Sequence, residues 1–170
     1  MNKRILISAL VLSCVTWSAQ AQGTAYPNKP VRLVVGFAPG GAADYVARAM
    51  SDAMGKAIGQ SVVVENRAGA GSSIAAENVA KAAPDGYSIL LASPSSISVN
   101  PALNPKLNYT PKDLVPITKV TTSPLVITVN PNIGINSVQD LIARAKQSPG
   151  KINYATSGNG SAPHLGAALF

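Results

Sequence analysis

Two glycine-rich loops carry the residues in this sequence whose chemistry best suits a bound ligand. The first glycine loop consists of Phe37, Ala38, Pro39, Gly40 and Gly41, and the second consists of Ser157, Gly158, Asn159, Gly160 and Ser161. Each loop precedes a predicted helix, whose first turn has unpaired N–H groups and a partial positive charge. Such donors could hold a carboxylate without lysine or arginine, and neither loop contains those residues. The alternative is a pair of tight turns without a ligand, in which Ser161 only caps a helix.

Two further side chains, Ser93 and His164, extend this candidate ligand-binding set. Ser93 lies where an apolar run gives way to a polar loop, and His164 is the only histidine. One histidine and one cysteine, Cys14, cannot assemble an ordinary zinc site, and the acidic residues are dispersed along the chain. We therefore expect no metal. His164 could contact a ligand, or it could pack and hydrogen bond within its own loop.

The motifs of common nucleotide-binding and hydrolytic sites are missing from the sequence. The glycines of the first loop do not form G-x-G-x-x-G or a phosphate loop, and no G-x-S-x-G nucleophile elbow occurs. We therefore expect a binding protein without a cofactor rather than an enzyme. The alternative is a secreted α/β enzyme, or a non-functional structural fragment, whose glycine loops are only turns.

Repeated strand-loop-helix units position these candidate residues. Apolar runs over residues 31–36, 61–66 and 87–93 are typical of strands buried on both faces of a parallel sheet. The helix after the first run has Val46, Met50 and Ala53 on one face, which allows it to pack on the sheet. Ser72 or Ser73 is the expected N-cap of the next helix. The resulting fold class is α/β, and ligands in open parallel sheets bind at the carboxyl ends of the strands.

The second half of the chain shows a looser pattern and then two more units. Four prolines between residues 97 and 116 break any long helix or central strand. We expect strands over residues 124–130 and 152–155, a helix over residues 138–147 capped by Ser137, and a helix from about Ala162. The sequence stops within that last helix, so we expect a fragment of a longer protein or a shortened variant. The alternative is a short chain whose last helix docks on its own sheet.

Residues 1–21 have the pattern of a secretory signal peptide. Lys3 and Arg4 precede an apolar run that is shorter than the roughly 20 residues of a spanning helix, and Ala19 and Ala21 form a small-residue cleavage site. We expect cleavage after Ala21. An acylated Cys14 is the alternative. The formal net charge is +7, but the basic residues are scattered, so nucleic acid is not an expected partner.

Three stretches of the mature chain together resemble a known family of receptors. YPNKPVRLVVGFAPGGAADYVAR, VVVENRAGAGSSIAAENVAKAAPDGYSILLAS and GKINYATSGNGSAPHLGAALF resemble, in this order, the Bug-type extracytoplasmic solute-binding receptors of tripartite tricarboxylate transporters. The resemblance implies a periplasmic monomer of the type II periplasmic-binding-protein fold. Its two α/β lobes would close like a Venus flytrap on a small organic anion such as a carboxylate and deliver it to membrane subunits.

The resemblance also implies how the chain divides and where its ligand binds. Residues 22–119 would form the N-terminal part of a first lobe, and residues 120–170 would form a second, truncated lobe. The first and second glycine loops would face each other across the cleft, with Ser93 near it and His164 in the helix of the second loop. Receptors of this family are roughly twice as long as this chain, so the flytrap is incomplete here.

Overall fold

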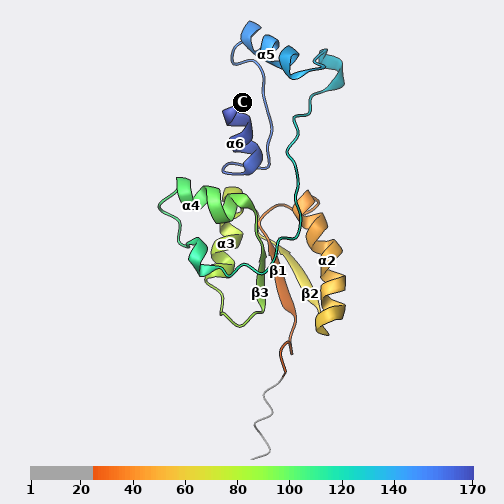
Figure 1. Cartoon of the computed structure of the whole chain (residues 1–170), viewed down its shortest axis with the longest axis vertical. Coiled ribbons are helices and arrows are strands. Elements are labelled where there is room, and N and C mark those ends of the chain that lie inside the picture. The colour runs from red at the N-terminus through yellow and green to blue at the C-terminus, as the bar shows by residue number, and fades with distance from the viewer. Residues whose placement is uncertain (1–24) are drawn as a thin grey trace, which may run out of the picture.

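Three short parallel strands form the sheet on which the fold is built (Figure 1). The computed structural model describes residues 25–170, so the expected signal peptide over residues 1–21 and its Cys14 lie outside the described residues. The strands are β1 (Val31–Val35), β2 (Val62–Asn66) and β3 (Ser88–Leu91), in the order β2-β1-β3. All three confirm strands predicted from the sequence. Their parallel pairing brings the three carboxyl ends to one edge, which we call the carboxyl edge.

Helices cover both faces of this sheet. Figure 1 shows α2 (Ala42–Ile58) and α3 (Ser73–Ala80) on opposite sides of the strands. Leu33 and Val35 of β1 pack against Ala47 of α2, whereas Arg32 of β1 hydrogen bonds to α3. Because successive side chains of a strand point to opposite faces, β1 is buried from both sides, as its mostly apolar run predicts. The exposed fractions of Val31, Val34 and Val35 are all 0%.

Only short helical turns follow β3 before the chain becomes extended. They are the π-helical turn η3 (Ser95–Val99), α4 (Asn100–Leu103) and the 3₁₀ turn η4 (Pro111–Asp113). A proline stands in the first turn of α4 and of η4. A proline is tolerated there but would break a longer helix, which agrees with the expectation of an interrupted region.

The second half of the chain contains η5 (Pro131–Ile133), α5 (Val138–Gln147) and α6 (Ala162–Leu169). Both caps expected from the sequence are present: Ser137 Oγ accepts the N–H of Asp140 at 3.1 Å, and Ser161 Oγ accepts the N–H of His164 at 3.3 Å. The strands expected over residues 124–130 and 152–155 are wrong. Both segments are extended, but neither is part of a strand ladder in the described residues. β-branched residues favour an extended backbone, whereas a strand also needs a neighbour to accept its hydrogen bonds.

These extended segments expose a row of apolar side chains. Leu125, Val126 and Ile127 are 60%, 78% and 60% exposed, and Ile152 and Tyr154 are also exposed. A contiguous row of apolar side chains in contact with water binds other apolar surfaces. Figure 1 shows α5 at the end of the molecule far from the sheet, and none of its residues is buried.

We expect this row to bind an apolar fluorescent dye in the otherwise folded chain. Val126→Lys should reduce the dye signal and leave the thermal midpoint unchanged, because the Val126 side chain is mostly in water. Val34→Lys is the matched control, and it should abolish folding because it buries a charge without a partner. A dye signal that Val126→Lys does not change would show that the dye binds elsewhere.

The N-cap of α3 departs from its expected form. Ser72 occupies the cap position, but its backbone is left-handed with φ 74° and its hydroxyl makes no cap hydrogen bond. The side chain is fully buried against Gly36, where an added Cβ would lie 1.8 Å from Ser72 Oγ. This hydroxyl has no hydrogen-bond partner among the described residues. A left-handed backbone and an unpaired buried hydroxyl both destabilise the fold.

We predict that Ser72→Gly raises the free energy of unfolding by about 1 kcal/mol, because glycine adopts this backbone freely and removes the unpaired hydroxyl. The neighbouring Ser73→Gly is the matched control. Ser73 is also buried, but its Oγ accepts from Asn100 Nδ2 at 3.0 Å, so its loss should lower the free energy of unfolding by about 2 kcal/mol. Urea denaturation of both variants measures the two values. A fall in stability for Ser72→Gly would contradict the assignment of strain to this position.

Candidate functional site

The first glycine loop connects the carboxyl end of β1 to the first turn of α2. Ala38, Pro39, Gly40 and Gly41 are exposed, and Phe37 is half-buried. Gly40 has a left-handed backbone with φ 82°, whereas the N-cap Gly41 has an ordinary φ of −81°. The N–H groups of Ala42 and Ala43 have no acceptor among the described residues, as expected at a helix start. The loop therefore presents free donors at the carboxyl edge.

Asp44 fixes the shape of this loop. Its carboxylate accepts from the N–H of Gly40 at 2.9 Å, from Arg48 Nε at 2.9 Å and from Asn66 Nδ2 at 3.0 Å. The same Asn66 amide nitrogen donates to the carbonyl of Phe37 at 3.0 Å. Sequence reasoning assigned no role to Asn66, which lies 22 residues from Asp44. Asp44 thus connects the loop to the end of β2 as well as lying in the first turn of α2.

The pairing of Asp44 also decides the local charge. Hydrogen bonds from Arg48, from the backbone of Gly40 and from Asn66 lower the pKa of Asp44 to about 2. The carboxylate is therefore ionised at neutral pH, beside the helix start that would attract an anionic ligand. Its side chain is only 5% exposed, and Arg48 lies against it, so its charge is largely compensated. The free N–H groups of α2 can then still interact favourably with an anion.

The second glycine loop has fewer free donors than its composition suggests. Gly160 donates its N–H to His164 Nδ1 at 3.4 Å, and Ser161 donates its N–H to the carbonyl of Gly158 at 3.1 Å. Ser161 is fully buried, and its hydroxyl caps α6. Ser157, Gly158 and Asn159 are exposed. His164 hydrogen bonds within its own loop, which is the structural alternative that the sequence left open.

Ser93 contacts the turn that follows β3. Its Oγ lies 3.4 Å from the Oγ of Ser96, and Ser96 Oγ donates to the carbonyl of Ser93 at 3.0 Å. Ser96 is fully buried, so Ser93 is anchored by a side chain that sequence reasoning did not select. The isolated serines of this segment give no periodic signal from which that anchor could be predicted.

The carboxyl edge brings most of the candidate residues into one region. The first glycine loop and Ser93 follow β1 and β3 directly. The second glycine loop comes to the same edge because Ala162, the first residue of α6, donates its N–H to Ser95 Oγ at 3.0 Å. Figure 1 accordingly shows α6 next to α4 at this end of the sheet. No hydrogen bond joins the first and second glycine loops in the described part of the chain, so their placement across a cleft stays a prediction.

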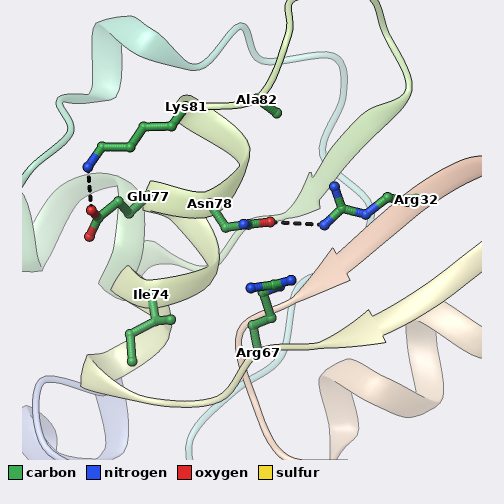
Figure 2. Close-up of a pocket in the computed structure, with 7 residues that line it drawn as sticks. All are labelled: Arg32, Arg67, Ile74, Glu77, Asn78, Lys81 and Ala82. Carbon is green, nitrogen blue, oxygen red and sulfur yellow. Dashed lines mark hydrogen bonds and ion pairs between the residues drawn. The ribbon is translucent and has the colours of Figure 1, made fainter.

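A hollow of about 500 Å³ lies away from these loops, on the side of the sheet covered by α3 (Figure 2). It is lined by Arg32, Arg67, Ile74, Glu77, Asn78, Lys81 and Ala82. Its cations are already paired. Arg32 contacts Glu65 at 2.8 Å and Asn78 at 3.0 Å, and Lys81 contacts Glu77, one helical turn away. No motif in the sequence predicts this hollow.

The described residues give no sign of a metal centre or a membrane-spanning helix. Within residues 25–170, no three side chains among His, Cys, Asp and Glu are grouped so that they could hold a metal ion. No helix in the same range is long and apolar enough to cross a bilayer.

We predict an acid-sensitive contribution of Asp44 to stability. A carboxyl whose pKa is about 2 in the folded chain, against a reference value of 3.8, stabilises the fold above the reference value. That contribution is lost as the pH falls toward the folded value, because the unfolded chain then binds the proton more readily. The free energy of unfolding should therefore fall between about pH 4 and pH 2 more steeply in the wild type than in Asp44→Asn.

Denaturation at a series of pH values measures this slope. In Arg48→Ala the loss should be smaller and should end at a higher pH, because the hydrogen bond from Arg48 is the largest cause of the lowered pKa and the reference pKa of the unfolded chain is unchanged. An Asp44→Asn variant with the slope of the wild type would show that Asp44 does not titrate with folding.

Comparison with known proteins shows the relatives of this chain. Residues 46–170 match the model of the "Tripartite tricarboxylate transporter family receptor". The protein BugT of Bordetella pertussis is 37% identical over 172 residues, which cover 100% of this chain and 53% of that protein. MatC of Rhodopseudomonas palustris, solved with bound malate, is 32% identical with a TM-score of 0.78, covering 85% of this chain and 49% of that one.

A second R. palustris structure, solved with adipate, is also 32% identical and gives a TM-score of 0.71, covering 85% of this chain and 49% of that one. The chain therefore spans about half the length of the relatives it matches. The family match covers most of the chain, and the solved neighbours share its fold of periplasmic binding proteins. The chain belongs to the receptor family of the tripartite tricarboxylate transporters.

Proposed function

We propose that this chain serves as a periplasmic solute-binding receptor that captures a small carboxylate or a related organic solute. The observation that carries the proposal is the free N–H groups of Ala42 and Ala43, which lie at the carboxyl edge of a parallel sheet. Ligands of open α/β folds bind at this edge, and helix starts there favour anions. The malate and adipate bound by two solved relatives belong to the same chemical class.

In the proposed site, one ligand carboxylate accepts hydrogen bonds from the first glycine loop and the start of α2. The ligand-binding set remains the one proposed from the sequence, namely the first and second glycine loops with Ser93 and His164. The geometry supports unequal roles within it. The first glycine loop leads directly to the free N–H groups of Ala42 and Ala43. In contrast, the side chains of Ser161 and His164 already accept hydrogen bonds from backbone N–H groups of their own segment. Ser157, Gly158 and Asn159 are the exposed members of that loop, so we assign its contact with the ligand to them.

Location and partners follow from the same proposal. Cleavage of the signal peptide over residues 1–21 would release the receptor into the periplasm, where it would act as a monomer. It would then deliver its solute to the membrane subunits of a tripartite transporter. The competing hypothesis of glycine loops that are only turns is favoured by one observation, the internal hydrogen bonds of Gly160 and Ser161.

A thermal-shift measurement distinguishes a receptor from a protein whose loops are only turns. A ligand that binds only the folded chain raises the midpoint as its concentration exceeds the dissociation constant. We expect malate or adipate to raise the midpoint and dimethyl adipate, which has no charge, to leave it unchanged. No shift with either acid, or equal shifts with acid and ester, would contradict recognition of a carboxylate by helix-start donors.

We predict that Gly41→Val weakens the binding of the responding acid by at least about tenfold, which corresponds to the loss of about one charge-assisted hydrogen bond. A Cβ at Gly41 meets only the carbonyl of Ala38 at 3.6 Å, so the variant should fold while its side chain blocks the start of α2. Gly166→Val is the matched control, since a Cβ there also makes only one ordinary contact, at 3.7 Å. Calorimetry measures both affinities. Full affinity in Gly41→Val would place the ligand away from this helix start.

A further inference from the structure

Two glycines from distant parts of the chain pack directly against each other at the carboxyl edge. Gly71 lies in the loop after β2 with φ 59°, and Gly160 lies in the second glycine loop with φ 75°. A Cβ added to Gly71 would lie 2.6 Å from the carbonyl carbon and oxygen of Gly160. Such a distance is shorter than real Cβ contacts allow, so this apposition of two backbones requires glycine at residue 71.

Asn100, at the start of α4, contacts both sides of this apposition. Its side-chain nitrogen donates to the carbonyls of Ala70 and Gly71 at 3.1 and 3.2 Å and to Ser73 Oγ at 3.0 Å. Its side-chain oxygen faces the opposite loop, because a Cβ on Gly160 would lie 2.6 Å from Asn100 Oδ1. Asn100 is 8% exposed, and a buried amide with several partners holds one orientation.

A third link ties the same loop to the turn after β3. Ser95 is 1% exposed, and its Oγ accepts the N–H of Ala162, 67 residues further along the chain. A partly buried hydrogen bond between two segments so far apart holds them together. The second glycine loop is therefore held through Gly71, Asn100 and Ser95, and none of these residues belongs to the proposed ligand-binding set.

We propose that Asn100 is a positioning residue that seats the second glycine loop on the carboxyl edge of the sheet before any ligand binds. Its amide nitrogen holds the loop after β2 in the shape that packs against Gly160, and its oxygen faces Gly160. We call the surface that Gly71 and Asn100 present to Gly160 the seat. Gly71 keeps the seat free of side chains. The seat exists without a bound solute, so this inference does not depend on the proposed function.

Hydrogen exchange of backbone amides, measured by NMR in a buffer without carboxylates, tests this role. The Ala162 N–H reports the seat, and the Val34 N–H, inside β1, reports the sheet. Asn100→Asp should speed exchange of Ala162 at least about tenfold and leave that of Val34 unchanged, because a carboxylate cannot donate to the carbonyls of Ala70 and Gly71. Asn104→Asp is the matched control. Its exposed Oδ1 only accepts, from the N–H of Lys106, and a carboxylate preserves that bond.

A second pair of variants leaves Asn100 intact and decides the question even where Asn100→Asp does not fold. Gly71→Ala should speed exchange of Ala162, whereas Gly59→Ala should not. Gly59 also has a left-handed backbone, with φ 71°, but a Cβ there meets nothing within 4 Å. Unchanged exchange of Ala162 in Gly71→Ala, or equal acceleration of Ala162 and Val34, would overturn the proposal. Neither result depends on whether malate or adipate binds.

Discussion

The parallel pairing of β1 with both of its neighbours is the constraint on which the rest of this structure depends. β1 pairs in parallel with β2 and with β3, and Arg32 is opposite Val63 and Ser88. The three strands therefore run in one direction. Every loop that follows a strand consequently starts from the same edge. The loop after β1 supplies free donors, the loop after β2 supplies Gly71, and the turn after β3 supplies Ser95. A candidate site built from distant segments is thus a direct consequence of strand direction.

Compensation of charge is what makes the helix start of α2 usable by an anion. Asp44 alone would repel a carboxylate, but Arg48 neutralises it, and Asn66 and the N–H of Gly40 stabilise its oxygens. The same hydrogen bonds fix the first glycine loop, so shape and charge come from one group of side chains. A surface ion pair contributes little by itself. Here the pair matters because Arg48 offsets the negative charge of Asp44. The partial positive charge at the start of α2 can then still attract an anion.

Sequence patterns predicted the sheet and both helix caps of the second half, because each depends on local residue types. Mostly apolar runs bounded by glycine or proline turns identified β1, β2 and β3, and serine before a helix identified Ser137 and Ser161. The failures have a different origin. Strands over residues 124–130 and 152–155 need partner strands, and the Asn66–Asp44 link joins residues that no local period relates. Likewise, an isolated asparagine before Pro101 gives no sign that Asn100 contacts two loops.

The two glycine loops, alike in composition, differ in how their backbone donors are used. In the second glycine loop the N–H groups of Gly160 and Ser161 already have acceptors, and the following N–H of Ala162 is bound by Ser95. In the first, the N–H groups of Ala42 and Ala43 at the start of α2 have none among the described residues. A ligand gains most from donors that are otherwise unpaired, because it replaces no protein hydrogen bond there. We therefore expect recognition of charge to belong to the first glycine loop rather than to the second.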